Sequence, residues 1–422
     1  MLFRSYGIKV NVEYSTFGTN EDLYNMITLG DVYDMVCPSE YMFMKLMDEG
    51  YLCPLSDGFF DESDPYNYYI KGVSPFIRRI FQENEIDGES WEKYAAGYMW
   101  GVTGIVYNPE EVTEEEASTW QILNNKNLYR QVTLKDNVRD SYFSAVGALK
   151  HDLLTSDSFV NDPDYHENLK AEMNDVSSET ISEALDFLQS CKKNAYSFET
   201  DSGKADMITG KVLANLQWSG DAVYTMDQAE EDDFILNFAV PEEATNIYFD
   251  GWCLMKNGIA ENSMKQDACE AFINFVSRPD NAIRNMYYIG YTSVIAGEAD
   301  DTRVFEYAKW NFGSEGSEEI VSYPLGYFFV DDNSDEDYII KVPSEQTKRQ
   351  LYAQYPTEDV IDRSSIMVCF DADVSEEINK MWISVRCYNI ADVPVFVWVI
   401  AGALAAVLVL AGVRRRKNKA EQ

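Results

Sequence analysis

Residues 33–50 read YDMVCPSEYMFMKLMDEG, and this stretch decides the fold class. The apolar run at residues 33–36 predicts a short strand, and the turn at Pro38 ends it. The spacing of apolar residues over residues 40–49 predicts a helix, which Gly50 ends at its C-terminus. Because short strands that alternate with helices indicate parallel pairing, the sequence predicts an α/β fold.

The same alternation of strands and helices continues on both sides of this stretch. Before it, residues 8–14 predict a strand, and residues 20–27 predict a helix with Asn20 as its N-cap. A chain of 422 residues is too long for one small core, so two domains are expected. After the stretch we expect strands at residues 104–108, 131–134, 212–217 and 247–255, helices at residues 141–149, 178–191 and 263–276, and a further helix opened by residues 118–120.

The charge balance restricts the possible partners. The chain carries 34 Lys and Arg against 72 Asp and Glu, which gives a formal net charge of −38. This charge would repel nucleic acid, whereas it favours a cationic ligand. An acidic, solvated exterior would give the same balance without any ligand. Aromatic residues make up 14% of the chain, including 28 Tyr, and aromatic rings can hold organic cations.

The residue patterns needed for several kinds of chemistry are missing from the sequence. The chain has seven Cys but no Cys-x-x-Cys pair, so neither a zinc site nor a disulfide scaffold is indicated. A His-rich metal site is excluded because the chain has only two histidines, His151 and His166. The Gly-Lys pairs at residues 203–204 and 210–211 lack the spacing of a phosphate-binding loop. We therefore predict no metal, no cofactor and no catalytic residue.

The C-terminal end of the chain has the composition of a membrane span. Residues 393–413 read VPVFVWVIAGALAAVLVLAGV, without a charge, and residues 414–419 read RRRKNK. About 20 apolar residues suffice for a helix to cross the bilayer, and a basic cluster stays on the cytoplasmic side. We expect a single transmembrane helix at residues 393–413, a cytoplasmic tail at residues 414–422 and a binding domain outside the cell. A buried core helix is the alternative interpretation.

The N-terminal end does not match that topology. Residues 1–14 contain no apolar core preceded by positive charge, so no signal peptide is visible. An external domain needs such a signal or an upstream membrane helix. We therefore expect that the true start of the protein lies upstream of Met1.

Carboxylates, aromatic rings and hydroxyl groups gather at the predicted ends of the strands. Ligands of open α/β sheets bind outside these carboxyl ends. Carboxylates and hydroxyls suit the ammonium groups of an organic polycation, and aromatic rings suit both its charges and its methylene stem. Each residue also has a purely structural explanation, since a single Trp or Tyr is usually core and an Asp after a strand is usually a helix cap. The candidate site residues are Ser39, Tyr41, Asp136, Asn137, Asp140, Trp218, Tyr248, Asp250 and Tyr291.

Eight stretches follow one another between residues 6 and 294: YGIKVNVEYSTFGTNEDLYNMI, YDMVCPSEYMFMKLMDEG, YMWGVTGIVYNP, LKDNVRDSYFSAVGAL, LANLQWSGDAVY, YFDGWCLMKNG, AFINFVSRPDNA and YIGYTSV. In sequence and order they resemble the spermidine/putrescine-binding proteins of polyamine ABC transporters, a family of type II periplasmic-type solute-binding proteins. The resemblance implies two α/β lobes, joined by crossover strands, that close on a ligand as a hinge. Lobe one would comprise residues 1–103 and 250–296, and lobe two residues 108–245 and 297–386.

The resemblance also implies that the nine candidate residues line the cleft between the lobes. Asp250 would bind an ammonium group, while Asn137 and Asp140 occupy the positions of the family's acid pair, with Asp136 beside them. Three features depart from the family pattern. Asn137 replaces an acid, Tyr248 replaces a common Trp, and the family's first strand would lie before the first residue of this sequence. A C-terminal membrane anchor is also unusual in the family.

These features together predict a membrane-anchored extracellular receptor that captures putrescine or spermidine and delivers it to ABC permease subunits. Three alternatives remain open at this point. The first is a receptor for another organic cation or a sugar. The second is a carboxylate-based ectoglycosidase, which would need two carboxyl groups about 5–9.5 Å apart across one glycosidic bond. The third is a fragment that binds nothing.

Overall fold

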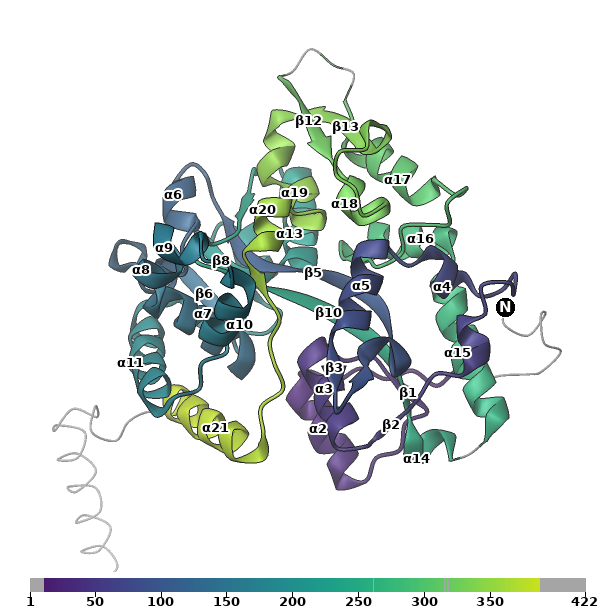
Figure 1. Cartoon of the computed structure of the whole chain (residues 1–422). Coiled ribbons are helices and arrows are strands. Elements are labelled where there is room, and N and C mark those ends of the chain that lie inside the picture. The colour runs from purple at the N-terminus through teal and green to yellow at the C-terminus, as the bar shows by residue number, and fades with distance from the viewer. Residues whose placement is uncertain (1–10, 261, 315, 317–318, 388–422) are drawn as a thin grey trace, which may run out of the picture.

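The computed structural model describes residues 11–260, 262–314, 316 and 319–387 (Figure 1). The predicted membrane helix at residues 393–413 and the tail at residues 414–422 lie outside these residues. Within the described part of the chain, no helix has both the length and the apolar character needed to cross a bilayer.

Two long strands, β5 (Ala95–Tyr107) and β10 (Thr245–Met255), run antiparallel through the middle of the molecule (Figure 1). They belong to one mixed sheet in the order β1-β10-β5-β8-β6-β7. On one side β1 (Met35–Val36) and β2 (Leu52–Cys53) pair with β10, and β11 (Thr292–Ser293) pairs with β5. On the other side β8 (Ala214–Trp218) and β9 (Asn237–Ala239) pair with β5, while β6 (Val132–Lys135) lies between β8 and β7 (Ser197–Glu199).

The prediction of parallel pairing is confirmed for only part of this sheet. β6 runs parallel to both β7 and β8, but β5 runs antiparallel to β10 and to β8. The antiparallel part arises because β5 and β10 extend through both halves of the sheet in opposite directions.

Aromatic packing forms the core beside β1 and β2. Phe43, Phe81 and Trp91 are almost fully buried, and their rings meet edge-on or tilted at centroid distances of 5.1–5.9 Å. Such contacts add to the stabilisation from apolar burial. The elements of this half are α2 (Asn20–Leu29), α3 (Glu40–Asp48), η1 (Asp57–Phe60), α4 (Tyr68–Gly72), α5 (Pro75–Glu83), β3 (Glu85–Ile86), β4 (Glu89–Ser90), η2 (Trp91–Lys93), α14 (Lys256–Ile259), α15 (Ser263–Val276) and α16 (Pro279–Ile289).

In the other half, α7 (Val138–Leu149) is buried on almost all of its residues. It is enclosed because α11 (Ser178–Asn194) packs on it, and α21 (Ala372–Arg386) in turn packs on α11 (Figure 1). The remaining elements are α6 (Glu114–Ala117), η3 (Trp120–Asn124), η4 (Lys126–Leu128), α8 (His151–Leu154), α9 (Asp157–Val160), α10 (Tyr165–Met173), α12 (Gly203–Ile208) and α13 (Ser219–Glu231).

The segment after α16 contacts both halves. Its helix α18 (Gly326–Phe329) packs on α5, and α19 (Gln350–Gln354) packs on α13. The short strand β14 (Ser364–Ser365) then pairs in parallel with the start of β10. The other elements of the segment are α17 (Arg303–Phe312), the hairpin β12 (Ile320–Pro324) and β13 (Ile339–Pro343), η5 (Glu336–Tyr338), η6 (Ser344–Lys348) and α20 (Glu358–Asp362).

Three local predictions were wrong. Residues 11–14 form no strand, and residues 8–10 of that predicted strand lie outside the described chain. The N-cap of α2 is Thr19, because its side chain and that of Asp22 form a reciprocal capping box. The helix expected from residues 118–120 is the single 3₁₀ segment η3, with Thr119 as its N-cap.

Candidate ligand-binding site

A cavity of 260 Å³ lies where the two halves of the sheet meet. Its walls come from residues that follow β1, β6 and β7, from the last residue of β8 and from side chains of β10, as expected for a site at strand ends. Further lining residues lie at the start of α2, just before β11 and just after β14. Eight of the nine candidate residues line it: Ser39, Tyr41, Asn137, Asp140, Trp218, Tyr248, Asp250 and Tyr291. The residues that sequence reasoning missed are Phe17, Gly18, Thr19, Asn20, Cys37, Glu40, Thr200, Asn246 and Met367.

One wall of the cavity carries Ser39, Tyr41 and Asp250, and an irregularity of the sheet places Asp250 there. The pairing of β10 with β5 shifts register between Asp250 and Gly251, and such bulges re-aim side chains. Ser39, the N-cap residue of α3, makes no side-chain capping bond. Its Oγ instead donates to Asp250 Oδ1 at 2.9 Å. Burial raises the pKa of Asp250 to about 6, although the bond from Ser39 opposes this shift.

Asn20 joins the same wall because Thr19 performs the capping. Its Nδ2 donates to the Tyr41 hydroxyl at 3.1 Å, and its Oδ1 accepts from the Ser39 backbone N–H at 3.2 Å. The Tyr41 hydroxyl donates to Glu21 Oε1 at 3.1 Å. Burial raises the pKa of Tyr41 well above its ordinary value, so the phenol is neutral. The capping box of Thr19 and Asp22 can be read from the sequence, and it could have shown that Asn20 is not the N-cap residue.

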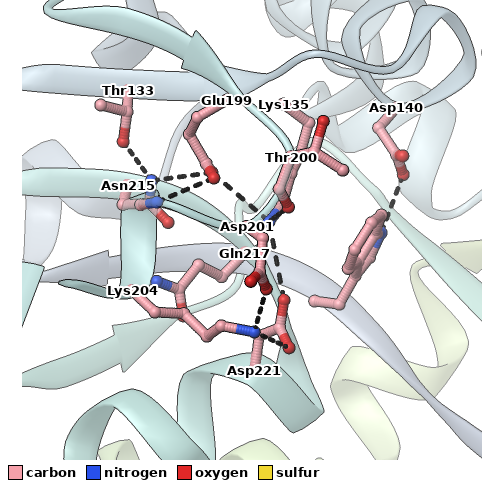
Figure 2. Close-up of polar contacts among 12 residues, drawn as sticks. Thr133, Lys135, Asp140, Glu199, Thr200, Asp201, Lys204, Asn215, Gln217 and Asp221 are labelled. Carbon is pink, nitrogen blue, oxygen red and sulfur yellow. Dashed lines mark hydrogen bonds and ion pairs between the residues drawn. The ribbon is translucent and has the colours of Figure 1, made fainter. Parts of the chain in front are cut away.

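Asp140 lies on the opposite wall, in the first turn of α7. Asn137 is the N-cap of this helix, and its Oδ1 accepts from the backbone N–H groups of Arg139 and Asp140 at 2.8 and 3.3 Å. The indole Nε1–H of Trp218 donates to Asp140 Oδ1 at 3.1 Å (Figure 2). Burial raises the pKa of Asp140 to about 6, and the Trp218 bond opposes this shift. Asn137 therefore combines the capping function with a place in the cavity.

A buried lysine lies behind this wall. The Lys135 ammonium is 4.4 Å from the ring centroid of Trp218, and only 1% of the side chain is exposed. It pairs with Glu199 at 3.4 Å and with Asp221 at 3.6 Å, within the charged network of Figure 2. The protein's own cation thus occupies one face of the indole that the sequence suggested for a ligand ammonium. The other contribution of Trp218 is its hydrogen bond to Asp140.

Asp136 is not brought to the cavity, which corrects the sequence-based assignment. Its carboxylate forms an ion pair with Arg386 of α21 instead. Successive side chains of an extended chain point to opposite faces. Because Lys135 points inward to the charged network, the neighbouring Asp136 points away from it.

Two tyrosines close the cavity between the walls. The ring centroids of Tyr248 and Tyr291 are 6.4 Å apart. The Tyr291 hydroxyl donates to Asp221 Oδ1 at 3.2 Å. Tyr291 also lies against Gly220, where a Cβ atom would come within 2.2 Å of the Tyr291 ring. The glycine after Trp218-Ser219 is thus required for this close approach.

Glu40 is a buried acid that no sequence pattern singles out, since an acid in the first turn of a helix is usually an exposed partner of the helix dipole. It is 0% exposed, and its Oε2 accepts from the Phe249 backbone N–H at 3.1 Å. Its Oε1 has no hydrogen-bond partner among the described residues. Burial raises the pKa of Glu40 to about 8.

A larger cavity of 560 Å³ lies elsewhere, beside α4, α5 and α17. Its lining carboxylates are paired, since Glu298 pairs with Lys71 at 3.4 Å and Glu62 pairs with Arg78 at 3.3 Å. The third, Asp301, pairs with Arg303. It therefore offers no unpaired carboxylates comparable to those of the smaller cavity.

Comparisons with known proteins bear on the family and the fold of the chain. A family model described as bacterial extracellular solute-binding protein matches residues 4–310. The spermidine/putrescine-binding periplasmic protein of Salmonella typhimurium is 24% identical over 285 residues, which are 67% of this chain and 70% of the relative. The putrescine-binding periplasmic protein PotF of Escherichia coli is 23% identical over 280 residues, which are 64% of this chain and 67% of the relative.

Two solved structures share the architecture. The TpPotD lipoprotein of Treponema pallidum has a TM-score of 0.61 at 17% identity, covering 91% of this chain and 93% of that one. The spermidine/putrescine ABC transporter substrate-binding protein PotD of Streptococcus pneumoniae has a TM-score of 0.58 at 23% identity, with coverages of 91% and 93%. The predicted two-lobe α/β binding-protein fold is thereby confirmed.

Proposed function

The chain belongs to the bacterial extracellular solute-binding proteins, and from this premise we propose that it captures a polyamine, putrescine or spermidine, for delivery to an ABC permease. Members of this family bind a solute for a transporter and are not enzymes. The polyamine is the part of the proposal that goes beyond the family.

The observation that carries the polyamine proposal is a pair of carboxylates on facing walls, of which Asp140 is buried and Asp250 is partly buried. Asp250 accepts one hydrogen bond, from Ser39, and forms no ion pair within the described chain. Asp140 accepts one from Trp218. A buried carboxylate without a cation is costly, so both groups would be stabilised by a ligand that carries two ammonium groups. A neutral sugar would leave both charges unpaired.

The relatives support the same class of ligand. The Salmonella protein is named for binding spermidine and putrescine, and PotF is named for binding putrescine. The eight candidate residues that meet in the cavity supply the carboxylates, hydroxyl groups and rings that suit such ligands. The permease as partner is supported by the PotD protein of Streptococcus pneumoniae, which is named as the substrate-binding protein of an ABC transporter.

We also propose the arrangement of the chain at the membrane and within the fold. Residues 393–413 would cross the membrane once and residues 414–422 would face the cytoplasm, with the cavity outside the cell. The two lobes would comprise residues 1–103 with 250–296 and residues 108–245 with 297–386, hinged at β5 and β10. Protease protection of the C-terminal tail in intact cells tests the first proposal.

Isothermal titration calorimetry of the full chain in detergent tests the ligand. Putrescine, spermidine and spermine are titrated in turn, with glucose as the neutral control. We expect saturable binding of at least one polyamine near micromolar affinity, about −8 kcal/mol, and no heat with glucose. Binding of glucose, or of no polyamine, would contradict the proposed ligand class.

A further inference from the structure

Two consecutive residues at the start of α3 bind two consecutive residues of β10. Ser39 Oγ donates to the Asp250 carboxylate at 2.9 Å, and Glu40 Oε2 accepts from the backbone N–H of Phe249 at 3.1 Å. This arrangement holds two carboxyl groups, those of Glu40 and Asp250, against the same wall of the cavity. Only Asp250 was expected there.

The surroundings of Glu40 favour its neutral form. The side chain is 0% exposed, and its Oε1 has no partner among the described residues. An ionised carboxylate in such a place lacks the hydrogen bonds that water would provide. Burial is the main reason why the pKa of Glu40 rises to about 8, and the nearby negative charge of Asp250 raises it further.

The remaining charged groups around Glu40 do not supply a counter-ion. Arg139 of α7 lowers the pKa of Glu40, but its guanidinium lies 4.0 Å from the Phe370 ring centroid and donates to the Val368 carbonyl oxygen at 2.7 Å. Glu21 of α2 is a further acid near Arg139. The Cys37 thiol, just before α3, is kept protonated because burial raises its pKa.

We propose that Glu40 and Asp250 form an acidic pair that holds a proton while the cavity is empty and releases it when a cationic ligand enters. The proposal rests on the proposed function, because it needs a ligand that brings positive charge. In this step one carboxylic acid becomes a carboxylate and its proton passes to the buffer. The positive charge of a ligand ammonium group then neutralises the carboxylate. Ligand and proton therefore compete for this wall.

Calorimetry in two buffers measures the proton directly. Putrescine is titrated into the full chain near neutral pH in phosphate and in Tris, whose ionisation enthalpies differ, so the difference in apparent enthalpy counts the protons released. We expect release of about one proton by the wild-type protein and at most half of that by Glu40→Gln, which retains an oxygen acceptor for Phe249 N–H. The matched control is Glu243→Gln, because Glu243 is equally buried and lies outside the cavity.

A second measurement needs no ligand. The unfolded chain releases the Glu40 proton near the ordinary pKa of 4.5, whereas the folded chain keeps it until about 8, so Glu40 weakens the fold as the pH rises between these values. Glu40→Gln removes that loss, and its melting temperature should rise above that of the wild type between about pH 5 and pH 8.5. Glu243→Gln corrects for the general effect of neutralising a buried acid.

The outcomes separate this inference from the proposed function. Putrescine binding with equal proton release by the wild type and Glu40→Gln would overturn the role of Glu40 and leave polyamine capture intact. Absence of any polyamine binding would overturn the proposed function and, with it, the release step. Parallel pH profiles of melting for the wild type and Glu40→Gln would overturn the proton-holding pair even in that case.

Discussion

At the scale of single residues, Asp140 and Asp250 decide what the cavity can bind. Asp140 is buried and Asp250 is partly buried, each accepts one side-chain hydrogen bond, and desolvation raises the pKa of each to about 6. The sequence could predict that Asp140 follows the strand β6 closely and that Asp250 lies on the strand β10, because strands are readable from composition. Asp136 was misplaced, since one position along an extended chain reverses the direction of a side chain. Glu40 was missed, since burial of an acid on a helix depends on the element packed against it.

The pKa values predict how the affinity for putrescine depends on pH. Above about pH 6 both carboxylates are ionised and attract an ammonium group, and below it they become protonated and lose that attraction. We expect the affinity to fall about tenfold for each of these two aspartates between pH 7 and pH 5, and the proton competition at Glu40 adds to this fall. Calorimetry across this range, with circular dichroism to verify the fold at each pH, provides the measurement. An affinity that stays constant would contradict the assignment.

Lys135 supplies a prediction about stability. Removal of its ammonium in Lys135→Met leaves Glu199 buried without a cation, whereas Asp221 keeps its ion pair with Lys204 at 3.1 Å. We expect a loss of about 3 kcal/mol in the free energy of unfolding, measured with urea. The control is Lys211→Met, which removes an ion pair with Asp206 whose lysine side chain is 50% exposed and should therefore lower the free energy of unfolding much less. Equal effects of the two substitutions would contradict the structural role of Lys135.

At the scale of elements, five strands of the main sheet could be predicted, namely β1, β5 in part, β6, β8 and β10, whereas the short strands and most pairing directions could not. The alternation of strands and helices indicated parallel pairing, which holds for β6 with β7 and β8. It did not reveal that β5 and β10 pair antiparallel over most of their length, because pairing direction depends on how distant segments return to the sheet. The length of β5 was underestimated as well, since its glycines resemble the end of a strand.

The contact between α13 and Tyr291 can be tested at Gly220, in the first turn of α13. A Cβ atom there would lie 2.2 Å from the ring of Tyr291, which would have to move away from the cavity and from Asp221. We expect Gly220→Ala to lower the free energy of unfolding by about 1–3 kcal/mol and to weaken putrescine binding. Gly58→Ala is the control, because its nearest neighbour would lie at an ordinary 3.6 Å. Urea unfolding and calorimetry of both variants measure the two effects.

At the scale of the whole molecule, the cavity depends on both halves of the sheet. The wall with Ser39, Tyr41 and Asp250 belongs to one half, and the wall with Asp140 and Trp218 to the other. A ligand that binds both walls must therefore favour the arrangement in which they face each other. The family order of motifs predicted this architecture, whereas the extent of each lobe and the membrane helix remain predictions. The formal net charge of −38 would attract a cation toward the cavity.

The central claim is that two carboxylates from opposite walls bind the charges of one ligand. The most direct test compares putrescine affinity in Asp140→Asn, Asp250→Asn and the double variant of the full chain, with Asp206→Asn as the control outside the cavity. Each single substitution should weaken binding roughly 10- to 100-fold, since a charged hydrogen bond contributes about 1.5–3 kcal/mol. The double variant should bind more weakly still, while Asp206→Asn should match the wild type. Unchanged affinity in either single cavity variant would contradict the account.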